Sequence, residues 1–302
     1  MSNIVIFFKL IRWKNLLLIA LGQVLVKQYL TNYITNPRFD DVAFSLLLLS
    51  TLFIAAAGYI INDIYDTEVD FINKPKRLII GKFISLEKAN NYYLLFNGFG
   101  LALGYYLAIR VGNKSLVTFF LITAALLYFY SISLKKVALL GNIVIALLVG
   151  FSLLLVALFA MYEVFQTNGI DLTIPTTIFQ VVFYYALFAS FINLIRELLK
   201  DIVDYEGDKQ FNFKTLPLIT SVKAAKIVSL ILTFTIIGAL FYIAYTVFNT
   251  NNIILFYSAG LIILLVYFFF RLLEANDKNA YKQQASFLKL IMLYAIFAIV
   301  LM

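Results

Sequence analysis

Long apolar runs follow one another along nearly the whole chain and are separated by short polar segments. Nine of these runs approach the roughly 20 residues that an α-helix needs to cross the hydrocarbon core of a bilayer. They cover residues 14–32, 42–62, 88–110, 115–132, 138–160, 176–198, 223–247, 252–271 and 285–302. The pattern predicts an all-α, multi-spanning membrane bundle of about nine transmembrane helices, with residues 1–302 forming one integral-membrane domain.

Composition supports this interpretation. Of the 302 residues, 63% are hydrophobic and 13% are charged, whereas a soluble domain is closer to half apolar and a quarter charged. Such a chain has too little polar surface to cover a soluble globule. The first apolar run is long enough to span and shows no small-residue cleavage pattern, so we expect it to stay as an anchor.

The basic residues predict the orientation. The N-terminal segment and the loops after the second, fourth, sixth and eighth runs hold 20 of the 24 Lys and Arg residues. The positive-inside rule places these segments in the cytoplasm, with the N-terminus inside and the C-terminus outside. In a bacterial cell the membrane would be the inner one. Net charge +8 then indicates topology and anionic headgroups or substrates, and no nucleic acid.

Two residue types are absent, and this limits the chemistry. The chain has no cysteine and no histidine. Disulfides, thiolate metal sites, imidazole ligands and histidine bases are therefore excluded. A metal ion would need oxygen ligands, which suit hard cations and above all Mg²⁺ when phosphate is present.

Acidic residues repeat with one spacing in two segments. NDIYDTEVD occupies residues 62–70, and KDIVDYEGD occupies residues 200–208. Both contain three aspartates spaced i, i+3, i+7: Asp63, Asp66 and Asp70, then Asp201, Asp204 and Asp208. On a helix these steps fall within about 60° of one another, so each triad predicts one acidic stripe at a helix end. The duplication suggests two related halves around one cytoplasmic-side cavity.

Three carboxylates on one face repel each other, and the cost grows when water is excluded. One such triad is equally consistent with a solvated helix end. Two matched triads on one side of a membrane favour a site that holds two or more Mg²⁺ ions. The ions would bridge to a ligand rich in phosphate oxygens, such as a diphosphate with a hydrocarbon tail among the helices.

The two segments resemble the paired aspartate motifs of the UbiA superfamily of intramembrane prenyltransferases. NDIYDTEVD is similar to its N-D-x-x-D-x-x-x-D motif, and KDIVDYEGD to its second motif. Residues 62–77, 141–150 and 196–218 resemble the digeranylgeranylglyceryl phosphate synthase branch. The chain departs from that branch where RLIIGK stands at 77–82 in place of R-P-I-P-S-G, and where RWKN stands at 12–15 in place of R-P-x-N.

The resemblance implies Mg²⁺-dependent transfer of a polyprenyl group from an allylic polyprenyl diphosphate to a membrane-associated acceptor. The hydroxyl of a prenylglyceryl phosphate is the first choice, and an aromatic quinone precursor such as 4-hydroxybenzoate is the alternative. A secondary transporter would tend to carry its acids near the bilayer midplane. A lipid-binding scaffold would not need two matched motifs. Membrane lipids are the expected surroundings, and no protein partner is implied.

The expected site residues follow from these motifs. The predicted metal ligands are Asn62, Asp63 and Asp66 in one cluster and Asp201, Asp204 and Asp208 in the other. The predicted catalytic set is Asp66, Asp70, Asp204, Asp208 and Arg77, with Asp70 orienting a metal-bound water or a basic neighbour. The predicted substrate-binding residues are Arg77, Lys76, Lys135, Lys200, Lys214, Tyr130, Asn15 and Asn142.

Two further groups of residues have possible roles in the transfer. Arg77 is the foremost phosphate ligand because its planar guanidinium suits phosphate. The faces of Tyr65, Tyr130 and Tyr205 could stabilise an allylic cation. A phosphate on the acceptor would need a cationic pocket, which Lys135, Lys136 or Arg12 could supply.

Overall fold

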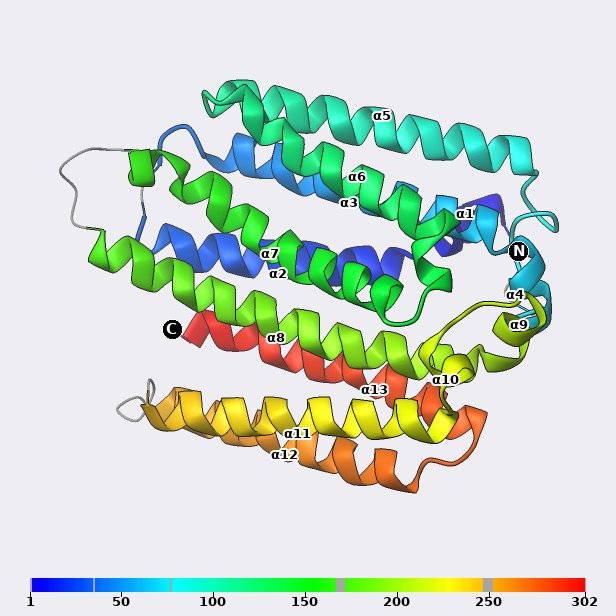
Figure 1. The fold of residues 1–302 in the computed structure, drawn as a ribbon. Coiled ribbons are helices and arrows are strands. Elements are labelled where there is room, and N and C mark those ends of the chain that lie inside the picture. Colours follow the sequence, from blue (N-terminus) through cyan, green and yellow to red (C-terminus); the bar gives the residue numbers. More distant parts are fainter. Residues whose placement is uncertain (1, 35, 77, 167–171, 247–251, 302) are drawn as a thin grey trace. The chain divides into compact units, whose positions relative to one another are not determined.

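The computed structural model describes residues 2–34, 36–76, 78–166, 172–246 and 252–301, which are almost entirely helical. The α-helices are α1 Asn3–Leu10, α2 Trp13–Thr31, α3 Asp41–Tyr65, α4 Thr67–Asn73, α5 Leu86–Arg110, α6 Val117–Ile132, α7 Leu140–Gln166, α8 Thr173–Val203, α9 Tyr205–Gln210, α10 Leu216–Ile219, α11 Val222–Thr246, α12 Asn252–Glu274 and α13 Lys278–Phe297 (Figure 1). Short 3₁₀ turns cover Lys114–Leu116, Leu134–Lys136 and Ala298–Leu301. The predicted all-α class is confirmed.

Each of the nine predicted spans coincides with a long helix. In the described part of the chain, eight helices are long and apolar enough to cross a membrane. The exception is α2, whose 19 residues include Lys14, Gln23 and Lys27. These polar residues lower its hydropathy, so the crossing of α2 stays a prediction.

The chain divides into two compact units. Unit 1 comprises residues 1–135 and 151–183, and unit 2 comprises residues 136–150 and 184–302. Helices α7 and α8 each contribute residues to both units. Each unit contains one of the two aspartate motifs.

In unit 1, α3 packs along α5 and α6, as the blue and green ribbons of Figure 1 show. Small residues allow this close approach. A Cβ on Gly104 would lie 2.6 Å from the ring of Phe120, and one on Gly100 would lie 2.7 Å from Ile54. Ser50 Oγ donates a 2.6 Å hydrogen bond to the carbonyl of Gly100. The contacts of Gly100 with Ile54 and Ser50 hold α3 against α5, and the Gly104–Phe120 contact holds α5 against α6.

The other end of α3 is fixed by Asp40. Its carboxylate caps the helix by accepting a 2.9 Å hydrogen bond from the Ala43 N–H, and a 2.6 Å bond from Arg110 at the end of α5. The capping hydrogen bond and Arg110 hold the pKa of Asp40 below its usual value. Both ends of α3 therefore carry aspartates with defined partners.

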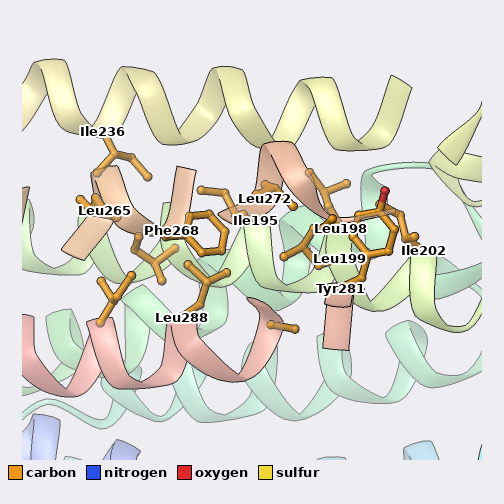
Figure 2. Packing of buried hydrophobic residues seen from close by; sticks show 14 of the residues in the cluster. Ile195, Leu198, Leu199, Ile202, Ile236, Leu265, Phe268, Leu272, Tyr281 and Leu288 are labelled. Carbon is orange, nitrogen blue, oxygen red and sulfur yellow. The ribbon is translucent and has the colours of Figure 1, made fainter. Parts of the chain in front are cut away.

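In unit 2, the apolar core forms between α8, α12 and α13. Figure 2 shows Ile195, Leu198 and Leu199 of α8 among Leu265 and Phe268 of α12. At 3.6 residues per turn, one face of α8 carries these side chains. The opposite face is left for polar residues, which continue to the second aspartate motif.

Candidate functional site

The two motifs share one backbone feature, a bend at the central aspartate. Helix α3 ends at Tyr65, and α4 begins at Thr67, with Asp66 between them at φ −94°, ψ 0°. Asp204 separates α8 from α9 with φ −94°, ψ 6°. The repeat seen in the sequence is therefore a repeat of local structure.

The bend lies at the middle aspartate of each predicted acidic stripe. The backbone hydrogen bond from Asp70 N–H to the Asp66 carbonyl persists at 2.7 Å, and that from Asp208 to Asp204 at 3.1 Å. With ψ near zero, however, the chain leaves the helical axis at the middle residue of each triad. The short second helix buries a side chain of its own, Val69 in α4.

In unit 1, Asp63 pairs with Arg12. The guanidinium Nη2 lies 2.5 Å from Asp63 Oδ1, and its carbon lies 5.0 Å from the centre of the Tyr59 ring. Arg12 itself adopts a left-handed conformation, φ 51°, between α1 and α2. Such a conformation costs a non-glycine residue energy and persists only where the surroundings enforce it. The ion pair with Asp63 is one such enforcing contact.

The central aspartate of unit 1 pairs with Lys135. Lys135 Nζ lies 2.5 Å from Asp66 Oδ1 and 3.4 Å from Asn62 Oδ1. The Asn62 amide donates to the other oxygen of Asp66 at 2.8 Å. The lysine side chain is only 8% exposed. Asn62, Asp66 and Lys135, three predicted site residues, are thus in direct contact.

Asp70 lies beside Lys74, with 3.5 Å between Lys74 Nζ and Asp70 Oδ1. Orienting a basic neighbour is one of the two roles that the sequence predicts for Asp70. Burial raises the pKa of the Asp70 carboxyl; Lys74 opposes this rise, and the negative charges of Asp66 and Asp63 add to it. A cation bound near Asp70 would relieve this repulsion.

In unit 2, Asp201 pairs with an amide. Asn142, at the start of α7, donates a 2.9 Å hydrogen bond to Asp201 Oδ2 and is buried. An isolated β-bridge pairs Val137 with Lys214, and the Lys214 N–H donates a 2.8 Å hydrogen bond to the Lys136 carbonyl. Lys136 Nζ also lies 5.5 Å from the centre of the Phe213 ring. Two backbone segments that flank the motif are thereby tied together.

Two charged residues of unit 2 were missed by the sequence prediction. Glu197 is buried and accepts hydrogen bonds from Arg196 Nη1 at 2.8 Å and from Lys200 Nζ at 2.6 Å. Lys200, a predicted ligand, thus contacts a carboxylate. The available signal was a charged pair, RE, at the end of the apolar run 176–198.

The other predicted site residues differ in their exposure to solvent. Lys76 and Lys214 are exposed, and neither side chain forms an ion pair with a described residue. Tyr65 is exposed, whereas Asn15, Tyr130 and Tyr205 are half-buried. Asp204 is half-buried and Asp208 is buried. The prediction for Arg77 lies outside the described residues.

The donor atoms fit a hard divalent cation. Among the described residues, no group of three or more acidic side chains lies close enough to hold a metal ion alone. Basic side chains stand instead at the carboxylates of Asp63, Asp66 and Asp70. Mg²⁺ is commonly bound through one or two carboxylates, with waters and substrate phosphates completing its coordination. Carboxylate and amide oxygens at Asn62, Asp63 and Asp66 meet that requirement.

Comparisons with known proteins agree with the paired motifs. The UbiA prenyltransferase family matches residues 30–293. A digeranylgeranylglyceryl phosphate synthase of Methanobrevibacter smithii is 34% identical over 85% of this chain and 86% of its own. Another from Sulfolobus acidocaldarius is 36% identical over 67% of each chain.

Solved structures show the same fold. A structure described as giving insights into digeranylgeranylglyceryl phosphate synthase in membranes has a TM-score of 0.67 at 26% identity, covering 100% of this chain and 98% of that chain. A UbiA homolog from Archaeoglobus fulgidus, bound to DMAPP and Mg²⁺, has a TM-score of 0.60 at 18% identity, covering 97% and 98% of the two chains. This second likeness concerns the fold alone. With residues 30–293 matched and both aspartate motifs in place, the chain belongs to the UbiA prenyltransferase family.

Proposed function

We propose that this membrane protein transfers a polyprenyl group from an allylic polyprenyl diphosphate to the free hydroxyl of a prenylglyceryl phosphate. The observation that carries the proposal is the duplicated bend, which places Asp66 and Asp204 in the same backbone setting at the ends of α3 and α8. The named function of the M. smithii and S. acidocaldarius relatives supports the choice of acceptor.

We assign the metal ligands to Asn62, Asp63 and Asp66 in unit 1 and to Asp201, Asp204 and Asp208 in unit 2. Two or more Mg²⁺ ions are expected from the two sets. When bound, Mg²⁺ neutralises the diphosphate and so eases its departure from the allylic carbon. The A. fulgidus homolog, which binds DMAPP with Mg²⁺, supports this cofactor.

The basic residues hold the carboxylates until substrate arrives. Arg12 pairs with Asp63 and Lys135 pairs with Asp66, and these ion pairs neutralise and orient the two carboxylates. Once a cation takes over that charge, both basic side chains can turn to the diphosphate oxygens. Arg77, Lys76, Lys200 and Lys214 are further phosphate ligands in this proposal.

The surrounding helices exclude water from the reacting carbon. Eight helices of the described chain are apolar enough to span the bilayer, and a dry cavity protects an allylic cation from hydrolysis. The distribution of Lys and Arg supports a cytoplasmic site, with the N-terminus inside and the C-terminus outside. Residues 1–302 would form one catalytic domain.

The test uses purified protein in detergent with radiolabelled geranylgeranyl diphosphate and Mg²⁺. Separate reactions contain geranylgeranylglyceryl phosphate or 4-hydroxybenzoate, each with and without EDTA. Asp66→Asn and Asp204→Asn are compared with Glu274→Gln, which alters an exposed acid of α12. The conservative replacements keep side-chain size and remove one negative charge.

We expect metal-dependent labelling of the glyceryl phosphate, lost in both aspartate variants and kept in Glu274→Gln. Labelling of 4-hydroxybenzoate alone would preserve the transfer chemistry and overturn the acceptor. Turnover without metal, or full activity in both aspartate variants, would refute the assignment of the motifs.

A further inference from the structure

Helix α8 carries a polar stripe that extends from the aspartate motif toward the middle of the membrane span. Asn193, Arg196, Glu197 and Lys200 lie on the side opposite the apolar core face, which Figure 2 shows at Ile195, Leu198 and Leu199. Asn193 and Glu197 are each only 5% exposed. Ionisable groups inside a membrane span are costly and mark functional sites by default.

The charges of the stripe form a compact group. Glu197 accepts hydrogen bonds from Arg196 at 2.8 Å and from Lys200 at 2.6 Å, so one carboxylate lies between two cations. Asp201, one turn further along the helix, is committed to a metal ion in the proposed function. The group formed by Arg196, Glu197 and Lys200 then carries a net positive charge.

Two hydrogen-bond donors of the polar stripe have no partner among the described residues. Arg196 Nε is buried and has no hydrogen-bond partner among the described residues, and the same holds for Asn193 Nδ2. The Arg196 side chain is 16% exposed. Buried donors are almost always paired, and an anion is the ligand that a guanidinium held in place by a carboxylate would best accept.

We propose that Arg196, positioned by Glu197, binds the phosphate of the prenylglyceryl phosphate acceptor. This inference rests on the proposed function and adds the residue that recognises its acceptor. In the acceptor, the phosphate lies only a few bonds from the hydroxyl that attacks. Arg196 lies little more than one helical turn from Asp201, so a phosphate held there keeps that hydroxyl close to the metal-bound diphosphate.

The partner of Arg196 distinguishes it from the residues proposed to bind the diphosphate of the prenyl donor. Its Nη1 is held by Glu197, a carboxylate outside both aspartate triads. Binding of a phosphate monoester at Arg196 therefore needs no Mg²⁺. Binding of the donor diphosphate depends on Mg²⁺, so the two sources of phosphate can be told apart by chelation.

The experiment measures binding by calorimetry in detergent with EDTA and without donor. The ligands are geranylgeranylglyceryl phosphate, the phosphate-free geranylgeranylglycerol, and geranylgeranyl diphosphate. The proteins are wild type, Arg196→Gln, Arg196→Lys and the control Arg271→Gln, whose arginine forms an exposed pair with Glu274 on α12. Size-exclusion profiles and melting curves establish that each variant is folded.

We expect Arg196→Gln to bind geranylgeranylglyceryl phosphate roughly tenfold to a hundredfold more weakly than wild type, the range for a lost charged hydrogen bond. Arg196→Lys should recover part of the loss, and Arg271→Gln should match wild type. Affinity for geranylgeranylglycerol should be the same in wild type and Arg196→Gln.

Two results would overturn the inference. In one, Arg196→Gln loses equal affinity for the phosphate-bearing and phosphate-free lipids, which would make Arg196 a packing residue. In the other, its acceptor binding is unchanged. If acceptor binding is unchanged while Asp66→Asn still abolishes transfer, the inference fails and the proposed function stands. If wild type transfers to no acceptor, the proposed function itself fails.

Discussion

The pair formed by Lys135 and Asp66 should determine how stable the protein is without metal. At 2.5 Å and an effective dielectric constant of about 20, two unit charges attract by about 7 kcal/mol before desolvation is subtracted. Removing one partner of a buried pair costs about 3–5 kcal/mol. Asp66 keeps 17% exposure and a hydrogen bond from Asn62, so we expect about 2–3 kcal/mol for Lys135→Gln, below that range.

The assay is thermal unfolding in detergent with EDTA. At about 2–4 °C per kcal/mol, Lys135→Gln should lower the melting temperature by roughly 4–12 °C. Adding Mg²⁺ should raise the melting temperature of this variant more than that of wild type, because the ion restores a positive charge beside Asp66. Lys76→Gln, which removes an exposed lysine six residues after the first aspartate motif, is the matched control and should leave the melting temperature unchanged.

A double variant completes the test. In Lys135→Gln/Asp66→Asn no charge is left unpaired, so part of the lost stability should return. A melting temperature of Lys135→Gln equal to that of wild type in EDTA would refute this role of the ion pair. So would a double variant that loses as much stability as the two single variants added together.

Three further predictions concern packing, pH and topology. Gly150→Ala should destabilise the protein by about 1–3 kcal/mol, because the added Cβ would strike a backbone carbonyl of α8. The control Gly238→Ala, with open space around the glycine, should be neutral or stabilise the protein by up to about 1 kcal/mol. Equal melting temperatures of the two variants would contradict this prediction. The depressed pKa of Asp40 means that its stabilisation is present above the unfolded-state pKa and is lost as pH falls through the lower folded-state pKa. Asp40→Asn should therefore melt below wild type at pH 7, with the difference shrinking below about pH 4, and a difference independent of pH would contradict the charge effect. Because the chain has no cysteine, Ser2→Cys and Tyr33→Cys can be labelled singly with an impermeant maleimide; labelling from opposite sides is expected if α2 crosses the membrane, and labelling from one side would exclude that crossing.

The helices and their order along the chain could be predicted because the sequence signals for them are local. An apolar run of about 20 residues specifies a membrane helix whatever the rest of the chain does, since backbone groups in lipid must be paired within the segment. The spacing of the aspartates is equally local, and it allowed the two motifs to be matched. Both motifs do lie at the ends of long helices, α3 and α8.

The partners of the aspartates could not be predicted from local patterns. Lys135 is 69 residues from Asp66, Asn142 is 59 residues from Asp201, and Arg12 is 51 residues from Asp63. Lys135 and Asn142 were named as substrate ligands, and Arg12 as a possible phosphate ligand, but no sequence rule assigned them to these carboxylates. The packing of α3 and the loop after α6 decides which basic side chain reaches which acid.

The charged residues of α8 show the same limit from the other direction. Arg196 and Glu197 are visible in the sequence at the end of an apolar run, where they could equally have been read as a solvated helix end. Their burial is a property of the folded chain. The sequence by itself determined the helices, their order and the spacing of the acidic residues, because these features depend on neighbours along the chain. Only the tertiary structure decided the bends at Asp66 and Asp204, the ion pairs and the buried polar stripe of α8. These features depend on residues that meet only when distant helices pack together.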